Sequence, residues 1–381
     1  MKVLHLVKTS VGGSWALRQM RELVKRGVEV HAAIPPDGPL LPHYNAAGVV
    51  VQPLQFDFPI RNLQKFPAIA KNLKRLVAHL KPDIIHSHFV GTTLTMRLAL
   101  GKRHSIPRIF QVPGPLHLEN RPFRWGEIIT SGPKDYWIGS CQWTIKRYIK
   151  SGISKNRVFL SYYGVDLKDF TLTEPTGKLR KELNIDNRNP LVGMVAYMYP
   201  PKRYLGHTRG IKGHEDLIDA LAKCRKSVPV LKGVFIGGAW GDAGDYEQRV
   251  YAYGRKRLGN AALFMGTRTD VTQLYPDLDI AVHPSHSENV GGACESLLMG
   301  VPTIATNVGG LPDVVIPGKT GWLVHPGNPD RLSEAILEVL SNPSYAKKLA
   351  LNGRQHVEEM MDVRKNASEI LQIYEKILAR A

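Results

Sequence analysis

The chain has 381 residues, of which 43% are hydrophobic and 22% charged, and its formal net charge is +18 at pH 7. This composition is typical of a globular enzyme and excludes a disordered or fibrous chain, and the length favours two domains over one. No window approaches the roughly 18 apolar residues of a membrane span, and "MKVLHLV" is too short an apolar run for a signal peptide. The three scattered cysteines support neither a disulfide framework nor a zinc site, so we expect a cytoplasmic protein.

The first 170 residues alternate apolar, β-branched runs with amphipathic stretches. The runs that predict strands are "KVLHLV", "VEVHAAI", "VVVQPL", "DIIHSHF", "RIFQVP", "YWIGS" and "RVFLSYYG". Between the first two lies "GSWALRQMRELVKRG", whose apolar residues fall at helical spacing and whose Gly27 fits a C-terminal stop. This alternation predicts a parallel sheet covered on both faces, that is, a doubly wound domain over residues 1–170.

A basic amphipathic segment lies within this domain at 63–80. Its apolar residues fall at helical spacing, and its lysines and Arg75 can occupy the other side. Such a helix packs on a sheet and leaves a solvated basic face, and the alternative use of that face is docking on anionic lipid at the inner side of a membrane. The charge can also indicate nucleic acid, but zinc-finger spacing and RNP-like aromatic strands are absent, so we expect no nucleic-acid partner.

The second half of the chain repeats the alternation after a polar connection, which we place at 171–189. Over 190–362 the predicted strands are "LVGMVAYM", "LKGVFIGG", "AALFMG", "DIAVHPS" and "PTIAT", with helices near 213–226, 244–257, 292–299 and 328–341. We expect residues 363–381 to form a helix that packs back on the N-terminal domain. The predicted fold class is α/β, with two tandem Rossmann-like domains facing across a ligand-binding cleft.

The stretch "HSENVGGACESLLMG" places Glu288 and Glu295 on either side of a glycine pair. Glu288 falls in the loop after a predicted strand, and Glu295 near the start of a helix. Gly291 and Gly292 let a ligand approach the backbone, and free N–H groups at a helix N-terminus suit a diphosphate. Carboxylates bind vicinal hydroxyls and repel phosphate. Taken alone the segment could be a plain turn and helix start, but it also fits a sugar nucleotide.

Further motifs occur along the chain in a specific order. They are "SVGGSWALRQMRELVKRGVEV", "DIIHSHF", "YYGVDLKDF", "GIKGHEDLIDAL", "ESLLMGVPTIATNVGGLPDVV" and "KTGWLVHPGNPDRLSEAI". Together with the two glutamates they resemble the signature of the retaining glycosyltransferases of family 4, which have the GT-B fold. The resemblance spans essentially the whole chain. It implies transfer of a hexose from a nucleoside-diphosphate sugar to an acceptor hydroxyl with retention at the anomeric carbon, without a cofactor or metal.

The resemblance also assigns residues to the donor. Lys212 matches the family lysine that binds the donor diphosphate. Glu295 matches the family residue that holds the ribose, and "FMGTRTDV" is similar to the segment that contacts the base. The residues expected at the donor are Gly12, Gly13, Arg203, Arg209, Lys212, Gly266, Thr267, Glu288, Asn289, Val290, Gly291, Gly292 and Glu295. Glu288, Lys212 and His117, which follows "QVPGP", are expected to act in catalysis. His86 and His88 are expected on the acceptor side.

The chain departs from the family pattern at two places. Six residues separate the two glutamates, one fewer than usual, so Glu288 is expected to reach the donor sugar differently. Tyr197 stands where the family often has an arginine that joins the lysine on the diphosphate. Arg203 or Arg209, in the inserted segment "PPKRYLGHTRG", is the predicted replacement. The "DLD" at 277–279 imitates a metal-binding motif, but it begins a buried strand without neighbouring ligands, so we interpret it as structural.

Several functions stay open at this point. A UDP-sugar is favoured over GDP-mannose as donor, and the acceptor is a glycan, a lipid-linked glycan or a small molecule in cell-envelope or polysaccharide synthesis. The alternatives are a sugar-nucleotide epimerase of the same fold and a glycosyltransferase acting on a small natural-product scaffold. A dehydrogenase is disfavoured because no G-x-G-x-x-G follows the first strand. A non-enzymatic basic binding protein would leave the glutamates and the Lys-Gly element unexplained.

Overall fold

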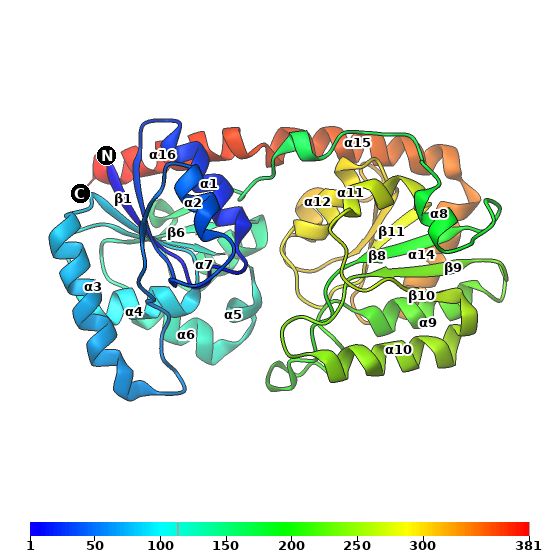
Figure 1. Cartoon of the computed structure of the whole chain (residues 1–381), viewed down its shortest axis with the longest axis horizontal. Helices are drawn as coiled ribbons and strands as arrows, with labels where there is room; N and C mark the ends of the chain where they lie inside the picture. Colours follow the sequence, from blue (N-terminus) through cyan, green and yellow to red (C-terminus); the bar gives the residue numbers. More distant parts are fainter. Residues whose placement is uncertain (113, 381) are drawn as a thin grey trace. The chain divides into compact units, whose positions relative to one another are not determined.

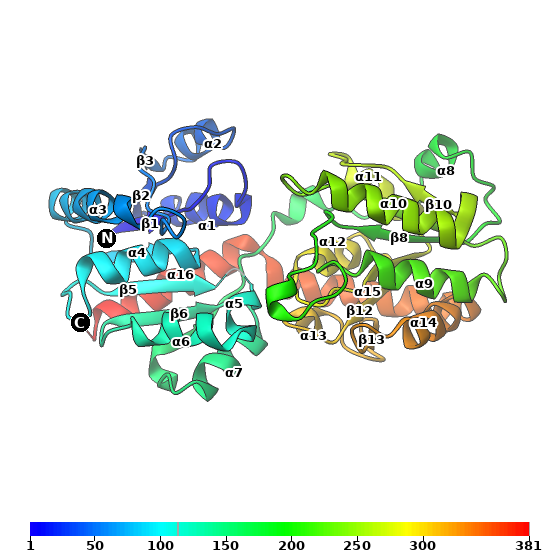
Figure 2. The same ribbon diagram turned by 90° about the horizontal axis from the view of Figure 1, so that it is seen from below.

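The computed structural model describes residues 1–112 and 114–380. The chain forms two compact units: an N-terminal unit of Met1–Asp166 with Met360–Ala381, and a C-terminal unit of Leu167–Glu359. Each unit is a parallel β-sheet with helices on its faces, as Figures 1 and 2 show. The predicted fold class of two Rossmann-like α/β domains is therefore confirmed.

The N-terminal unit contains a seven-stranded parallel sheet in the described residues, in the order β3-β2-β1-β4-β5-β6-β7. Its strands are β1 (Lys2–Leu6), β2 (Glu29–Ala33), β3 (Val50–Gln52), β4 (Ile84–Ser87), β5 (Arg108–Val112), β6 (Asp135–Gly139) and β7 (Val158–Leu160). Its helices are α1 (Ser14–Val24), α2 (Leu41–Ala46), α3 (Phe66–Leu80), α4 (Val90–Leu100), α5 (Leu116–Glu119), α6 (Arg121–Ile129), α7 (Gln142–Lys150) and α16 (Val363–Leu378). The strand order reverses between β1 and β4, and ligands of such sheets bind at this reversal.

Alternating side chains of the strands supply the core on both faces of this sheet. One face buries apolar residues of α1 and α16, and the other buries those of α3 and α4. The helix α16 is part of the first cluster, since Ile370, Ile373 and Ile377 are buried there with Val3 of β1. Each such side chain contributes roughly 1.5–3 kcal/mol through removal from water. The last helix of the chain thus belongs to the core of the first unit.

The C-terminal unit contains a six-stranded parallel sheet, again in the described residues, in the order β10-β9-β8-β11-β12-β13. Its strands are β8 (Leu191–Val195), β9 (Lys232–Ile236), β10 (Ala262–Phe264), β11 (Ile280–His283), β12 (Thr303–Thr306) and β13 (Trp322–Val324). The helices are α8 (Lys178–Glu182), α9 (His214–Cys224), α10 (Gly244–Leu258), α11 (Val271–Leu274), α12 (Gly291–Leu298), α13 (Leu311–Val314), α14 (Pro329–Ser341) and α15 (Pro343–Met361). Here the strand order reverses between β8 and β11.

Two parts of this unit differ from the sequence prediction. The segment 171–189, predicted as a linker, lies within the C-terminal unit and contains α8. The buried carboxylate of Asp277 fixes this segment to the unit. The carboxylate accepts hydrogen bonds from the backbone N–H groups of Gly177 (2.8 Å) and Leu179 (2.7 Å). The first aspartate of "DLD" therefore stabilises the start of a helix. The strand β13 was not predicted, because its three residues, Trp322–Val324, lie between polar and glycine-containing turns and do not form a longer apolar run.

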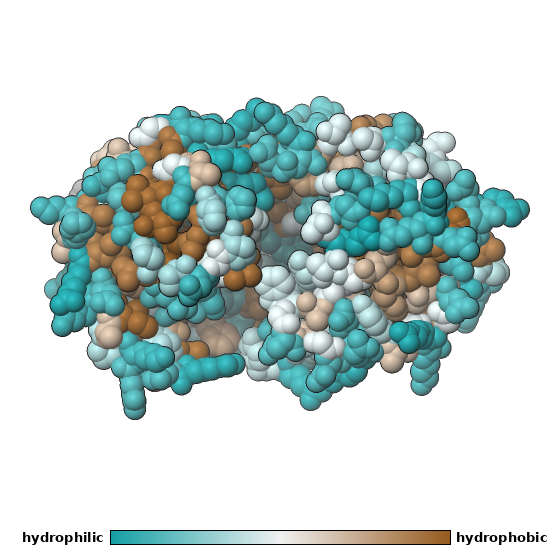
Figure 3. All heavy atoms as spheres, viewed as in Figure 1, coloured by the Kyte–Doolittle hydropathy of each residue, from teal (hydrophilic) through white to brown (hydrophobic). Residues whose placement is uncertain are grey.

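Hydrophilic residues cover most of the face drawn in Figure 3. On the face drawn in Figure 3, apolar residues gather over the part of the N-terminal unit where Figure 1 labels α2 and β1. Among the described residues, no helix is both long enough and apolar enough to cross a membrane.

Candidate active site

A cavity of about 370 Å³ opens at the carboxyl ends of the C-terminal sheet. Its wall includes Val195 at the end of β8, Ile236 at the end of β9 and His283 at the end of β11. Because the strand order reverses between β8 and β11, the cavity lies at the position where doubly wound sheets bind ligands. The topology of the sheet alone would therefore select this cavity as the site.

Most of the donor residues predicted in this unit lie at the cavity. Those that line it are Lys212, Thr267, Glu288, Gly291, Gly292 and Glu295. Gly266, Asn289 and Val290 are their chain neighbours. These residues come from three separate segments of the chain: the loop before α9, the turn after β10, and the loop that joins β11 to the start of α12. The parallel sheet brings the three segments to one edge.

Lys212 and Glu288 form an ion pair in the cavity wall. The ammonium group of Lys212 also lies 5.7 Å from the ring centroid of Tyr199, within cation–π range. Burial alone would raise the pKa of Glu288, but the Lys212 charge and hydrogen bond, with a 3.0 Å hydrogen bond from the Asn289 N–H, lower it below its ordinary value. Glu288 is therefore an anion that holds the lysine in place.

The start of α12 supplies backbone donors beside this pair. No side chain caps the helix at Val290, so the N–H groups of its first turn are available to a ligand. A Cβ on Gly292 would lie 3.0 Å from Nδ1 of His283, so the imidazole would have to shift to admit a larger residue. At Gly291 a Cβ would meet nothing within 4 Å, so that position faces open space. A helix N-terminus next to a lysine is an anion-binding arrangement.

His283 connects the strand end to the helix. Its Nε2 lies 3.0 Å from Oγ of Ser296 in α12, and this hydroxyl lies 2.9 Å from that of Thr303 in β12. Burial lowers the pKa of His283 to about 4, so the imidazole is neutral near pH 7. This side chain was not predicted from the sequence. It fixes α12 against the sheet and therefore positions the N–H groups at the start of the helix.

The predicted replacements for the missing arginine do not line the cavity. Arg209 donates to Asp216 (2.7 Å) and to Asp219 (2.8 Å), which occupies its guanidinium at α9. Arg203 is exposed in a short 3₁₀ turn, Arg203–Leu205. The arginine that does line the cavity is Arg268, in the segment expected to meet the base. The guanidinium of Arg268 forms ion pairs with Asp270 and Glu182.

Aromatic side chains stand where the family arginine was expected. Tyr197 and Tyr199 both line the cavity. The ring of Trp240 lies 5.1 Å from that of Tyr197 and 5.5 Å from that of Tyr199. Burial raises the pKa of Tyr199 to about 12, so its hydroxyl stays protonated. The cavity therefore replaces one cation with apolar ring surface and hydrogen-bonding hydroxyls.

The N-terminal unit holds the remaining predicted residues. Gly12 and Gly13 lie between β1 and α1, and Gly13 has φ +87°, a left-handed conformation that favours glycine. His117 is partly buried in α5, with Nε2 3.2 Å from the Tyr148 hydroxyl, and burial lowers its pKa to about 4. Its predicted contact with the donor sugar stays a prediction.

His86 and His88, predicted on the acceptor side, are completely buried. Nδ1 of His86 lies 2.5 Å from the Tyr374 hydroxyl of α16, and Nε2 of His88 lies 2.8 Å from Nδ1 of His5. Burial, first of all, lowers the pKa of each imidazole well below its ordinary value. His86 packs against Tyr374 of α16 and His88 against Trp15 of α1. Because both side chains are completely buried, neither can touch an acceptor directly in this structure.

Comparison with known families agrees with this geometry. A model described as "Glycosyl transferases group 1" matches residues 179–356, and one described as "Glycosyltransferase Family 4" matches residues 13–169. The two matches fall on the two units in turn. The chain belongs to the family 4, group 1 glycosyltransferases.

Individual relatives of this glycosyltransferase are distant. It is 24% identical over 321 residues to sulfoquinovosyl transferase SQD2 of Arabidopsis thaliana and 26% identical over 242 residues to spore coat protein SA of Bacillus subtilis. These matches cover 79% and 61% of the chain, and they span 59% and 62% of the relatives' own lengths.

Solved structures confirm the GT-B fold of this glycosyltransferase. HepE of Anabaena, solved in complex with UDP, has a TM-score of 0.81 at 21% identity, and the match covers 98% of this chain and 100% of HepE. Sucrose-phosphate synthase of Thermosynechococcus elongatus has a TM-score of 0.80 at 21% identity over the whole of both chains.

Proposed function

We propose that this glycosyltransferase moves a hexose from a UDP-sugar, rather than from GDP-mannose, to an acceptor hydroxyl with retention at the anomeric carbon. The observation that supports this is one cavity that combines the Lys212 ammonium, the uncapped start of α12 and the carboxylates Glu288 and Glu295. Solved structures of HepE contain UDP and UDP-glucose, which supports a uridine donor. We propose a role in cell-envelope or polysaccharide synthesis, in the cytoplasm at the inner face of the membrane.

The chemistry follows from the charges in the cavity. Negative charge grows on the leaving diphosphate as the bond to the anomeric carbon breaks. Lys212 and the N–H groups at the start of α12 stabilise that charge, and they are already oriented before the donor arrives. A donor phosphate competes with Glu288 for the Lys212 ammonium. Glu288 is then free to accept a hydrogen bond from a hydroxyl of the transferred sugar, and Glu295 accepts those of the ribose.

The proposed mechanism uses no metal or cofactor, because Lys212 and the α12 backbone neutralise the diphosphate. We expect turnover to be the same in the presence of EDTA as in added Mg²⁺. A loss of turnover in EDTA that Mg²⁺ restores would show that the two protein groups are insufficient.

Product analysis tests the proposal directly. The purified protein is incubated with UDP-glucose, UDP-galactose, UDP-N-acetylglucosamine or GDP-mannose and a membrane-derived glycan acceptor, and diphosphate release is measured. We expect release of UDP from one α-configured donor, an α-linked product by NMR, and at least about a tenfold loss of turnover for Glu288→Gln, as for other lost charge-assisted contacts.

Three other products would contradict parts of the proposal. GDP release alone would overturn the choice of donor, and a β-linked product would overturn retention. Interconversion of two UDP-sugars without diphosphate release would identify an epimerase instead.

A further inference from the structure

The helix α6 packs Ile128 on the core of the unit, but it also buries a carboxylate and exposes large apolar side chains. The carboxylate of Glu127 on its inner face is completely buried. On its outer face Trp125 is 67% exposed and Ile129 is 45% exposed, while Phe123 in the first turn is 47% exposed. A helix on the surface of a globular protein normally has the opposite arrangement, with the apolar face inward.

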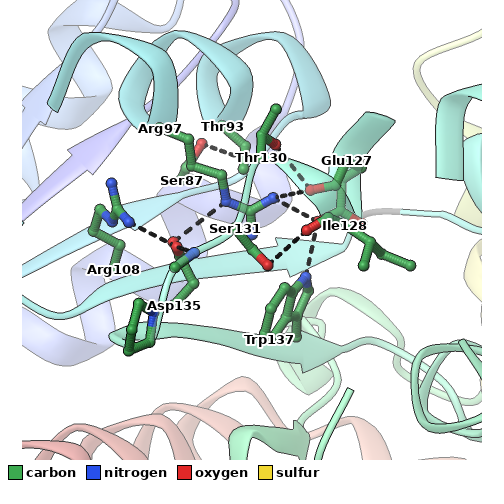
Figure 4. Close-up of polar contacts among 12 residues, drawn as sticks. Ser87, Thr93, Arg97, Arg108, Glu127, Ile128, Thr130, Ser131, Asp135 and Trp137 are labelled. Atoms are coloured by element: carbon green, nitrogen blue, oxygen red, sulfur yellow. Dashed lines mark hydrogen bonds and ion pairs between the residues drawn. The ribbon is translucent and has the colours of Figure 1, made fainter. Parts of the chain in front are cut away.

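Buried ion pairs fix this orientation, as Figure 4 shows. Glu127 accepts hydrogen bonds from Nη1 of Arg97 (2.8 Å) and from Nε1 of Trp137 (2.8 Å). Arg97 also contacts Asp135, which pairs with Arg108 at 2.7 Å. Rotation of α6 to bury Trp125 would separate Glu127 from these partners and leave buried charges uncompensated. The exposed apolar side chains are therefore held outward by the core of the unit.

Three arginines lie near one another here: Arg121 and Arg124 belong to α6, and Arg147 belongs to α7. Nη1 of Arg124 and Nε of Arg147 both donate to the carbonyl oxygen of Leu118, at 3.1 and 3.4 Å. Burial, followed by the charges of Arg147 and Arg121, lowers the pKa of Arg124. In the part of the chain that the structure describes, none of these three arginines forms an ion pair with a carboxylate. Like charges thus gather beside Trp125 without local neutralisation, which an anionic partner would supply.

We propose that the outer face of α6, with Arg121, Arg124 and Arg147, docks the N-terminal unit on an anionic membrane surface. The arginines bind lipid phosphates, and Trp125 and Ile129, one helical turn apart, enter the boundary between headgroups and acyl chains. Tryptophan is enriched at that boundary. An aliphatic side chain such as Ile129 favours lipid over nucleic acid as the partner.

The helix α3, for which the sequence leaves lipid docking as an alternative to a solvated basic face, has a different distribution. Its residues Leu73, Leu76, Val77 and Leu80 are buried in the core. The exposed charged side chains of α3 are basic, and no phenylalanine, tyrosine or tryptophan of this helix is fully exposed. Only α6 combines the two components among these helices.

The place of α6 connects docking with the proposed function. The helices α5 and α6 follow β5, at the carboxyl edge of the N-terminal sheet, and α5 contains His117. A lipid-linked acceptor would reach this edge from a docked surface. The class of acceptor in this inference rests on the proposed function. Membrane docking itself does not, because membrane binding can be measured without turnover.

Vesicle flotation tests the docking. The full-length protein is mixed with vesicles of phosphatidylcholine alone or with phosphatidylglycerol, and the bound fraction is measured. We expect binding only with phosphatidylglycerol and a loss of about tenfold or more in the partition coefficient for the double variant R121Q/R124Q and for W125S/I129S. In brominated vesicles, the tryptophan quenching of the wild type should be largely lost in Trp125→Phe.

Matched controls separate the surface from general effects. Trp240→Ser removes an exposed tryptophan of the C-terminal unit and should bind vesicles like the wild type. The inference would be overturned if the protein did not bind vesicles with phosphatidylglycerol, or if only the α3 variant K71Q/K74Q/R75Q lost binding. It would also be overturned if the α6 variants weakened binding to single-stranded DNA but not to vesicles.

A further readout separates this inference from the proposed function. Thermal melting is recorded for every variant with and without UDP, and the α6 variants should keep the wild-type melting temperature and UDP shift. A protein that floats but gives no shift with UDP contradicts the proposed function and leaves the docking intact.

Discussion

At the scale of single residues, the two glycines at the start of α12 have different roles. A Cβ on Gly292 would lie 3.0 Å from the His283 ring, which would have to shift, whereas Gly291 faces open space. A sequence shows only that both are glycine. Gly292 therefore has a role in packing and Gly291 a role in ligand approach. The two roles can be compared with one alanine variant at each position, since both variants add one methyl group.

We predict that Gly292→Ala lowers the melting temperature and that Gly291→Ala does not. An overpacked site costs typically 1–3 kcal/mol, so Gly292→Ala should lower the melting temperature by several degrees. Gly291→Ala should keep the wild-type melting temperature but weaken UDP binding, because its methyl group occupies the space above the helix start. Calorimetry with and without UDP checks both. Equal UDP affinity in Gly291→Ala and the wild type would contradict ligand approach at this position.

The sequence predicted part of the site residue by residue. Lys212, Glu288 and Glu295 were found because they stand in motifs, and all three line the cavity. His283 and Arg268 were missed, because a histidine at a strand end and an arginine in a turn have no periodicity or spacing that separates them from structural residues. Which of several arginines reaches the cavity depends on side-chain direction, which sequence spacing does not contain.

At the scale of elements, β1 and β4 have neutral histidines in the interior of the N-terminal sheet. His5 pairs with His86 in the strand register, and both are completely buried. Burial lowers the pKa of His5 to about 3. In the unfolded chain this histidine has the ordinary value of about 6.5, so the unfolded state binds more protons at any pH between these values.

We predict that the N-terminal unit loses stability as the pH falls below about 6.5, and that the loss continues toward pH 3. Each histidine that must stay neutral contributes up to about 1.4 kcal/mol per pH unit in this range. Urea unfolding at a series of pH values measures the slope. His5→Gln should flatten the slope between pH 6 and 4 by about one proton. An unchanged slope in this variant would contradict a neutral, buried His5.

At the scale of the whole molecule, strand-helix alternation was sufficient to predict two parallel-sheet units. The prediction succeeded because the central strands of both sheets are buried and read as apolar runs. It failed for α8, because its sequence "KLRKE" is polar and the buried carboxylate of Asp277 holds it in place. The C-terminal unit begins at Leu167 rather than at 190, because long-range contacts rather than local patterns assign a segment to a core.

We propose above all that the C-terminal unit binds the diphosphate of a uridine donor through Lys212. Calorimetric titration of UDP into the wild type, Lys212→Ala and the control Lys223→Ala, whose lysine lies outside the cavity on α9, tests it most directly. A hydrogen bond to a charged group is worth about 1.5–3 kcal/mol, so Lys212→Ala should raise Kd at least about tenfold while the control binds like the wild type. Absence of UDP binding to the wild type, or equal affinity in Lys212→Ala, would contradict the account.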